Sequence, residues 1–397
     1  MTNDRVIIAG AGPTGMSAAL FLTSLDVSVL VIDCHAEDVK DPRAATFHPP
    51  TLEMFSTSGV TDRLHEQGYI VPTWQMRDLK KGLIAEFDMS ALNRDTEYPY
   101  RLQCEQHKLV AILRAELAQR NNCEIIRGHK VTSVEQDAYG VTVTTENSEH
   151  SGRYLIGADG GRSTIRKSQN IDFEGFVYPE QFLVVTNTYD FEAEGYALSC
   201  YVSDPESWCA VFKVPGEGPP GLWRVVFSTD PKENEQTLLS HTYAQERLVR
   251  FLPREKPYEI VHTNLYKVHQ RVASTYRNGR VMLAGDAAHI NNPLGGMGMN
   301  FGIHDAHSLA EKLAAIMKNG ASEDLLDLYD RQRRSVANEF LQKMTIDNKK
   351  SLEETNEVAL RKRQAYLKET AADPEKARQH LMRTAMFEGL KSAEQIQ

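Results

Sequence analysis

A glycine-rich turn between an apolar strand and a helix constrains the fold more than any other feature of the chain. Residues 6–9 read Val-Ile-Ile-Ala, and the next glycines have GxGxxG spacing: Gly10, Gly12 and Gly15. A second apolar run ends in an acid, Asp33. Strand, glycine turn, helix and terminal acid at this spacing are typical of a dinucleotide-binding βαβ unit. The sequence therefore predicts an α/β domain.

Each of these residues has a separate physical task in such a unit. Gly10 makes the tight turn, Gly12 leaves room for a pyrophosphate group, and Gly15 lets the helix pack closely on the strand. We expect the carboxylate of Asp33 to accept hydrogen bonds from a ribose diol. The first N–H groups of the helix would point at phosphate oxygens.

A second passage from strand to helix lies at residues 280–301. Its apolar strand ends in Gly285-Asp286, a helix is expected from about Asn300, and the loop between them contains Pro293, Gly295, Gly296 and Gly298. Glycine lets bare backbone approach a ligand closely, and the helix N-terminus directs N–H groups at anionic or electron-rich atoms. Asp286 is placed to accept a hydrogen bond from a ribityl-type hydroxyl.

A third strand, turn and helix lie between these two passages. Residues 154–157 are apolar, and Asp159-Gly160 follows them. Ser163 is a predicted helix N-cap, with Arg166 in the first turn of the helix. Taken alone, this segment is an ordinary Asp-Gly turn.

The composition is that of a soluble globular protein with room for two domains. Of the 397 residues, 41% are hydrophobic and 25% charged, and no apolar run approaches the length of a bilayer-spanning helix. A net charge of -9 argues against nucleic acid as a partner. Five cysteines without a CxxC pair and no secretory signal indicate a cytoplasmic protein. The histidines form no HExxH or Cys–His pattern, so no metal is expected.

In order and spacing, the three motifs resemble the GxGxxG, DG and GD motifs of the group A flavoprotein monooxygenases, the family of p-hydroxybenzoate hydroxylase. The resemblance extends from Val6 to about residue 345. It implies FAD as the cofactor, with NADPH or NADH and dioxygen as co-substrates. It also implies a Rossmann-type FAD-binding domain with an inserted, mostly antiparallel β-sheet substrate domain and a helical C-terminus.

The apolar runs divide the chain into three regions. The FAD-binding domain is expected to be discontinuous and to comprise residues 1–75, 102–172 and 272–320. The substrate domain is expected to comprise residues 76–101 and 173–271, with strands at 181–188, 197–202, 209–214 and 222–228.

Residues 321–397 are expected to be helical. A helix with Tyr329, Arg333 and Arg334 resembles one that packs on the FAD domain of the family. The polar residues after it are interpreted as solvated helices, with a homodimer contact as the alternative.

The resemblance also assigns residues to the cofactor. Arg43 matches an arginine that reaches the phosphate or adenosine side of FAD. Gln106, which begins a helix expected over 106–120, matches a glutamine that contacts the flavin linkage, and Gln103 competes for this role. Met299 and Asn300 would lie near the pyrimidine side of the flavin ring. The other implied cofactor residues come from the three motifs: Gly10, Gly12, Pro13, Thr14, Gly15, Asp33, Asp159, Asp286, Gly295, Gly296 and Gly298.

The implied reaction is the NAD(P)H-consuming hydroxylation of a phenolic or hydroxylated N-heteroaromatic compound. In the family, NAD(P)H reduces FAD, dioxygen then forms a flavin C(4a)-hydroperoxide, and one hydroxyl is delivered to an electron-rich ring. Pro293 holds a family position whose carbonyl lies near the peroxide, and it is the candidate for orienting that group. The family commonly has two prolines here, whereas this chain has Asn292 before Pro293.

Three further residues are candidates for contact with the substrate. Tyr201 begins a Tyr-Pro-aromatic spacing that resembles the phenol-activating tyrosine of the family, and it could accept the phenol proton; a structural tyrosine on a sheet is the alternative. Arg224 could pair with a substrate carboxylate or face water at a sheet edge. His48 could line the pocket or lie in the core. His289 is expected to shape its loop rather than to transfer a proton.

Two other classes of function stay open. A related flavin enzyme could catalyse halogenation or epoxidation, but none of Trp74, Trp208 and Trp223 sits in the WxWxIP segment of halogenases, and the tail is charged rather than apolar. A non-catalytic flavin-binding protein is the other alternative, and the intact GD loop argues against it.

Overall fold

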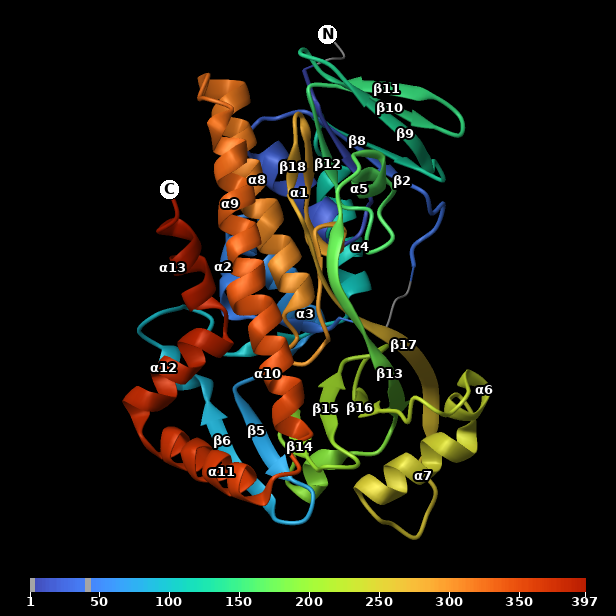
Figure 1. Cartoon of the computed structure of the whole chain (residues 1–397), viewed down its shortest axis with the longest axis vertical. Coiled ribbons are helices and arrows are strands. Elements are labelled where there is room, and N and C mark those ends of the chain that lie inside the picture. Colours follow the sequence, from blue (N-terminus) through green and yellow to red (C-terminus); the bar gives the residue numbers. More distant parts are fainter. Residues whose placement is uncertain (1–3, 40–43) are drawn as a thin grey trace.

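The computed structural model describes residues 4–39 and 44–397, so that Arg43 lies outside the described part of the chain. Two large sheets dominate the fold (Figure 1), a six-stranded sheet in the upper half of the view and an eight-stranded sheet in the lower half. The long strands β13 (Phe173–Asn187) and β17 (Ile260–Ala273) run between the two halves as an antiparallel pair. The expected α/β fold with an added sheet domain is confirmed.

The six-stranded sheet brings the three sequence motifs to one edge. Its order is β18-β19-β12-β1-β2-β8, and every neighbouring pair except β18 and β19 is parallel. Because the carboxyl ends of parallel strands meet at the same edge, the loops that follow these strands converge there. The strands are β1 Val6–Ala9, β2 Val29–Asp33, β8 Cys123–Arg127, β12 Tyr154–Gly157, β18 Arg277–Asn278 and β19 Val281–Leu283.

Helices in this half of the molecule begin where local sequence favours a helix start. Pro13 is the first residue of α1, where its missing N–H costs no hydrogen bond. The hydroxyl of Ser163 accepts the N–H of Arg166 at 2.9 Å, so Ser163 caps α5 as predicted. The helices are α1 Pro13–Ser24, α2 Pro49–Ser56, α3 Val60–Gln67, α4 Gln106–Leu117, α5 Thr164–Ser168 and α8 Gly298–Asn319.

The eight-stranded sheet has the order β20-β17-β13-β16-β15-β14-β5-β6 and is antiparallel except between β14 and β5. The first strand of this sheet along the chain starts at Thr73, whereas the substrate domain was expected to start at residue 76. The last strand along the chain, β20, comes from residues that were expected in the FAD domain. Its other strands are β5 Thr73–Asp78, β6 Gly82–Asp88, β14 Ser199–Ser203, β15 Cys209–Val214, β16 Leu222–Ser228 and β20 His289–Ile290. Two helices, α6 Glu235–Leu238 and α7 His241–Phe251, connect β16 to β17.

Two small three-stranded sheets complete the fold. One is an antiparallel meander of β9 Val131–Gln136, β10 Val141–Thr145 and β11 Glu149–Gly152. The other places β7 between β3 and β4, and its strands are β3 Thr46–Phe47, β4 Tyr69–Val71 and β7 Arg101–Gln103.

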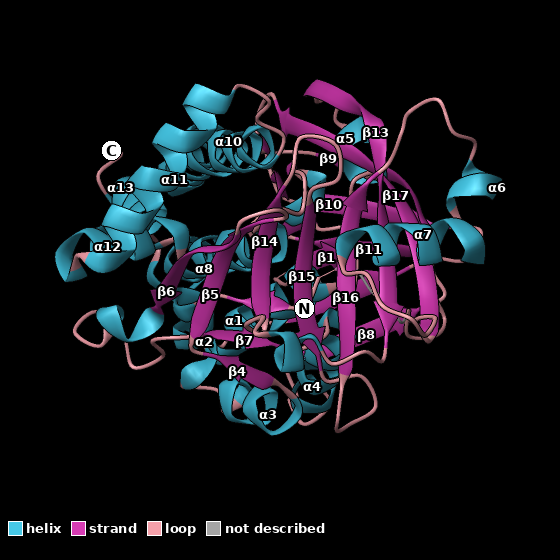
Figure 2. Ribbon diagram, turned by 90° about the horizontal axis from the view of Figure 1, so that it is seen from below, coloured by secondary structure: helices cyan, strands magenta, loops and turns pink. Residues whose placement is uncertain are grey.

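The C-terminal region is helical as expected, but the interpretation of its last part as solvated helices is wrong. Figure 2 shows α10 to α13 beside the edge of the large sheet formed by β5 and β6. Apolar side chains of these helices are buried in one cluster with Trp74 and Phe87: Leu352, Leu367, Leu381, Met382 and Phe387. The helices are α9 Asp324–Val336, a π-helical turn Ala337–Gln342, α10 Lys343–Leu352, α11 Glu357–Ala372, α12 Pro374–Thr384 and α13 Phe387–Glu394.

This packing was missed in the sequence because the apolar residues of these helices are few among many charged ones, and each helix buries only a narrow apolar stripe.

Within residues 4–39 and 44–397, no helix combines the length and the apolar character that crossing a bilayer requires.

One buried carboxylate ties the second motif to the helices behind it. Asp305 on α8 is fully buried and accepts hydrogen bonds from the Gly285 N–H at 3.0 Å and from Arg333 Nε at 2.6 Å, and His289 Nε2 lies 2.7 Å away. Burial acts to raise the pKa of Asp305, but Arg333 and His289 outweigh it and hold the pKa below its ordinary value. Such a carboxylate stabilises the fold above its unfolded pKa and loses that contribution as pH falls through the folded pKa. His289 thus shapes its loop, as expected.

We expect Arg333→Met to lower the free energy of unfolding by about 3–5 kcal/mol, because it leaves the Asp305 carboxylate buried without its main counter-charge. Arg331→Met, at an exposed position of the same helix, is the matched control and should change stability little. Combining Asp305→Asn with Arg333→Met should cost less than Arg333→Met alone, since no unpaired charge stays buried. Urea unfolding measures all three, and equal losses in the single and double variants would contradict this account.

Candidate active site

A cavity of about 710 Å³ lies between the motif edge of the six-stranded sheet and one face of the eight-stranded sheet. It is lined by most of the residues that the sequence predicted at the site: Gly10, Gly12, Pro13, Thr14, Asp33, Gln106, Asp159, Tyr201, Asp286, Pro293, Gly296, Gly298 and Met299. Gln103, the competitor of Gln106, lines it too. The three motifs and the candidate tyrosine therefore share one continuous space.

Five predicted site residues do not line this cavity: Gly15, His48, Arg224, Gly295 and Asn300. Gly15 was expected to pack the helix on the strand, and a Cβ there would lie 1.9 Å from the carbonyl oxygen of Gly10. The other four, His48, Arg224, Gly295 and Asn300, lie outside the cavity lining.

The glycine turn is shaped to admit a ligand next to its backbone. Gly10 has φ +106°, and a Cβ there would lie 2.3 Å from the carbonyl oxygen of Ala158, so only glycine fits. At Gly12, by contrast, a Cβ would meet no protein atom within 4 Å, because the position faces the cavity. The N-terminus of α1 opens onto the same space, and this arrangement fits the pyrophosphate of a dinucleotide.

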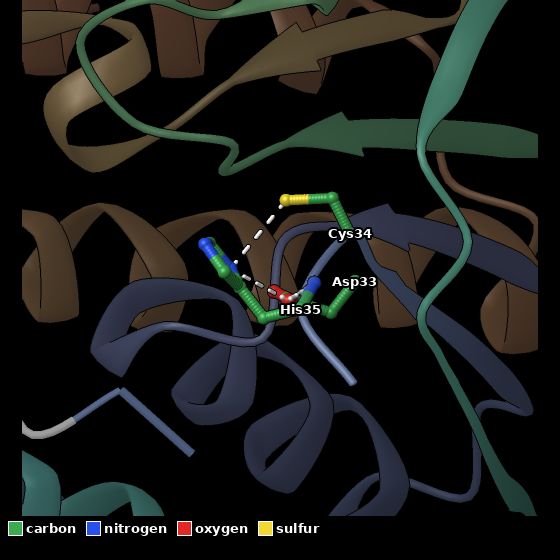
Figure 3. A group of neighbouring side chains, drawn as sticks. All are labelled: Asp33, Cys34 and His35. Atoms are coloured by element: carbon green, nitrogen blue, oxygen red, sulfur yellow. Dashed lines mark hydrogen bonds and ion pairs between the residues drawn. The ribbon is translucent and has the colours of Figure 1, made fainter. Parts of the chain in front are cut away.

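Asp33 braces the glycine turn, since its carboxylate accepts the Ala11 N–H at 2.6 Å. The carboxylate also accepts the His35 N–H at 2.7 Å, and the His35 ring lies 3.1 Å away (Figure 3). Each carboxylate oxygen has a further lone pair to offer to a ribose hydroxyl. Burial and the Asp33 charge raise the pKa of the Cys34 thiol, which works against a thiolate ligand. Asp33, Cys34 and His35 are close enough together to hold a metal ion, but the position of Asp33 fits the dinucleotide role better.

Asp159 caps the helix that follows the third motif. It accepts the Ser163 hydroxyl at 2.5 Å and the N–H groups of Thr164 and Ile165 at 2.7 and 3.1 Å. Burial raises the pKa of Asp159, and these hydrogen bonds oppose that shift. Its carboxylate therefore holds the turn that faces the cavity.

His48 and Asn300 hold the loop that carries Pro293, so they are not pocket-lining groups. His48 Nε2 donates to the carbonyl oxygen of Gly295 at 2.9 Å. Burial, assisted by the charge of Arg101, lowers the pKa of His48 to about 3, so the ring is neutral near pH 7. Asn300 Oδ1 accepts the N–H of His48, and its Nδ2 donates to the carbonyl oxygen of Gly296 at 2.8 Å. The burial of His48 agrees with the alternative that it lies in the core and does not fit a pocket-lining or catalytic role.

Asn292, which replaces the first proline of the family pattern, clamps the loop from the other side. Its Nδ2 donates to the Thr345 carbonyl oxygen at 2.9 Å, its N–H donates to Gln270 at 3.0 Å, and its Oδ1 accepts the Leu294 N–H at 3.1 Å. Asn348 on α10 donates to the Leu294 carbonyl oxygen at 3.1 Å. Hydrogen bonds to α10 on both sides of Pro293 therefore fix the backbone there.

The opposite wall of the cavity is a largely apolar face of the eight-stranded sheet. Tyr201 on β14 is its polar centre and is half-buried. Around it are apolar side chains from neighbouring strands: Val184, Ala210, Phe212, Val226 and Val268. Arg224 pairs across the strands with Phe212 but is buried and does not line the cavity, so it does not fit the predicted substrate contact.

Sequence reasoning missed a buried arginine behind this wall. Arg101 on β7 hydrogen-bonds the side chain of Tyr201, and its guanidinium lies 5.1 Å from the Trp74 ring centroid. A three-residue strand gives no local signal of such a contact, and a charged residue is ordinarily expected at the surface.

Two positively charged side chains and a histidine lie in one part of the cavity lining. Arg162 and Lys267 are exposed there, and His269 is half-buried beside them. Burial lowers the pKa of His269, and the charges of Arg271, Arg162 and Lys267 add to this effect. This part of the cavity is therefore suited to an anionic ligand.

Comparison with known proteins identifies the larger family. The family described as "FAD binding domain" matches residues 3–344. Para-nitrophenol 4-monooxygenase of Pseudomonas sp. strain WBC-3 is 34% identical over 398 residues, which covers 99% of this chain and 98% of that protein. The 6-hydroxy-3-succinoylpyridine 3-monooxygenase HspB of Pseudomonas putida is 32% identical and covers 88% of this chain and 89% of its own length.

Structural comparison agrees. The crystal structure of p-nitrophenol 4-monooxygenase PnpA from Pseudomonas putida DLL-E4 matches with a TM-score of 0.91 and 33% identity over 98% of both chains. The three motifs, the cavity that they line and these relatives agree with one another. The chain belongs to the group A FAD-dependent aromatic monooxygenases.

Proposed function

We propose that this monooxygenase hydroxylates a phenol or a hydroxylated N-heteroaromatic ring, with NADH or NADPH as the reductant. The observation that carries the proposal is the position of Tyr201. It lies on the largely apolar wall of the same cavity that the FAD motifs line. The named substrates of two relatives, a nitrophenol and a hydroxypyridine derivative, are both hydroxylated aromatic rings. One oxygen atom of dioxygen would enter the ring, the other would leave as water, and the reductant would supply two electrons.

The residues that line the cavity divide the work. The glycine turn and Asp33 would hold the adenosine diphosphate half of FAD, and the loop from Pro293 to Met299 would surround the flavin ring. Reduced FAD supplies the activation of dioxygen. The chain's own task is to place the ring of the substrate, to keep water away from it with the valine-rich wall, and to hold the substrate hydroxyl at Tyr201.

The cationic part of the cavity lining supports the use of a nicotinamide dinucleotide. Arg162 and Lys267 present positive charge that suits phosphate oxygens, and His269 beside them adds a ring N–H donor. An anionic reductant guided to this region would approach the flavin through the cavity itself rather than through a separate nucleotide-binding fold.

The direct test is NADH and NADPH oxidation by the FAD-loaded enzyme against a panel of phenols and hydroxypyridines that includes 4-nitrophenol. We expect at least one ring to accelerate oxidation and to yield an oxygenated product by mass spectrometry. Yellow, FAD-loaded protein that oxygenates none of these rings with either reductant would overturn the proposal.

Gly12→Val should abolish FAD retention while leaving the apoprotein folded, because the new side chain would enter the open space at the turn without touching protein atoms. Gly10→Val is the matched contrast, since its side chain would collide with the Ala158 backbone and should destabilise the fold itself. FAD content by absorbance and melting temperature of the apoprotein separate the two effects. Normal FAD content in Gly12→Val would show that the pyrophosphate lies elsewhere.

Tyr201→Phe should lower the rate of hydroxylation by about a hundredfold or more, because the substrate hydroxyl loses its polar partner. The control is Tyr196→Phe, because Tyr196 does not line the cavity. The guanidinium carbon of Arg77 lies 4.1 Å from the centroid of the Tyr196 ring. Single-turnover rates at saturating substrate measure the chemical step apart from binding. Equal rates in wild type and Tyr201→Phe would remove Tyr201 from the reaction.

Replacing both Arg162 and Lys267 by Gln should raise the KM for the reductant by roughly tenfold, with little change in the maximal rate of flavin reduction, because these cations assist binding and not the chemistry. Anaerobic stopped-flow reduction at two salt concentrations checks this, and the salt dependence should weaken in the variant. Lys376→Gln, far from the cavity lining, is the control. An unchanged KM would place the reductant elsewhere.

A further inference from the structure

Arg101 is a buried cation that lacks a carboxylate partner. Its side chain is 3% exposed, and among residues 4–39 and 44–397 no Asp or Glu forms an ion pair with it. A charge buried in this way is costly unless something of opposite sign compensates it. The hydroxyl of Tyr201 and the face of the Trp74 ring are the contacts that the structure gives the guanidinium, and neither is a carboxylate.

The other titratable groups around Arg101 cannot supply a negative charge. His48, before α2, has its pKa lowered to about 3, chiefly by burial, and His380, on α12, has its pKa lowered to about 4 for the same reason. Arg101 contributes to both shifts. The two rings are therefore uncharged near pH 7, and the surroundings of Tyr201 carry a net positive charge.

Several buried nitrogen atoms near Arg101 also lack a hydrogen-bond partner within the described residues: His48 Nδ1, Trp74 Nε1, Arg101 Nε and His380 Nε2. Trp74 joins these groups, since its ring centroid lies 6.1 Å from that of Tyr201 and 5.9 Å from that of His380. A concentration of unsatisfied nitrogen atoms calls for an explanation in a folded protein. Here Trp74 and Arg101 can only donate, so their N–H groups add to the positive potential behind Tyr201.

The direction of the hydrogen bond decides what Tyr201 offers to the cavity. A guanidinium has no acceptor, so the oxygen of Tyr201 accepts from Arg101. The proton of the Tyr201 hydroxyl stays available to donate into the cavity that the side chain lines. The cavity therefore presents a hydrogen-bond donor with a positive charge behind it, which is complementary to an anionic oxygen. This reverses the expectation that Tyr201 accepts the phenol proton.

Building on the proposed function, we propose that Arg101 acts through Tyr201 to select ring substrates in their ionised form. The class of substrate is an acidic phenol or hydroxypyridine whose electron-withdrawing substituent lets the hydroxyl ionise near neutral pH. When such a ring enters as the neutral phenol, its O–H bond breaks, the proton passes to solvent, and the phenolate oxygen accepts from Tyr201. Arg101 is a positioning residue in this arrangement, because the substrate touches Tyr201.

The test measures protons released on binding, with FAD-loaded oxidised enzyme and 4-nitrophenol as the probe. In weakly buffered solution below the pKa of the free probe, we expect wild type to release about one proton for each molecule bound. The bound probe should show the absorption of the nitrophenolate. Arg101→Met should release almost no proton and bind the probe about tenfold to hundredfold more weakly. The control is Arg77→Met. This variant removes an arginine that stacks on Tyr196 and does not line the cavity, so proton release should persist.

Two further variants keep the test decisive if Arg101→Met does not fold. Arg101→Lys keeps a charge at this position and should retain part of the proton release. Tyr201→Phe leaves Arg101 in place but removes the donor, and it should abolish the release in protein that still retains FAD. Unchanged proton release in either Arg101→Met or Tyr201→Phe would overturn the inference.

The outcome also separates this inference from the proposed function. An enzyme that hydroxylates a phenol but binds it without releasing a proton would overturn the selection of the ionised form alone. An enzyme that binds and oxygenates no phenol or hydroxypyridine would overturn both.

Discussion

The buried carboxylate of Asp305 is the constraint on which the cofactor side of the structure depends. It joins residues far apart in sequence, since Gly285 follows β19, His289 begins β20 and Arg333 lies on α9. Because Gly285 is fixed in this way, the adjacent Asp286 is presented to the cavity while Asp305 stays in the core. The loop that follows is held at its other end by Asn300. A single charged residue therefore sets the start of the loop that carries Pro293 and lines the cavity.

The local parts of this fold and site were predictable from the sequence. The strands Cys209–Val214 and Leu222–Ser228 have the expected bounds, because apolar runs lie between turn residues. The motif residues converge for a topological reason, since each follows a strand of one parallel sheet. What a short motif determines is the path of its own backbone. Gly10 and Gly12 illustrate this, because their roles depend on space within the turn.

The contacts between distant elements could not be predicted in the same way. Asn300 was predicted near the flavin ring and His48 in the pocket or the core, but the sequence does not show that both side chains hold the loop from outside the cavity. Arg101 reaches Tyr201 from a short strand on another sheet, with no residue spacing to signal it. The C-terminal helices were misjudged because their charged surfaces outnumber the few apolar residues, such as Leu381, that pack on the large sheet.

The two ends of the cavity are built by different kinds of chemistry, and this has a consequence for specificity. At the cofactor end, glycine positions, N–H groups and helix N-termini make the site, so it tolerates few changes in backbone. At the substrate end, the wall consists of side chains from several strands, backed by Trp74, Arg101 and His380 from three separate elements. Changing one of these side chains alters the charge or shape that meets the ring without moving the flavin loop. Relatives that act on a nitrophenol and on a hydroxypyridine derivative can thus share one cofactor site. In this chain, the feature that distinguishes one ring from another is therefore the unpaired charge of Arg101 at the substrate end. No residue of the three motifs has that role.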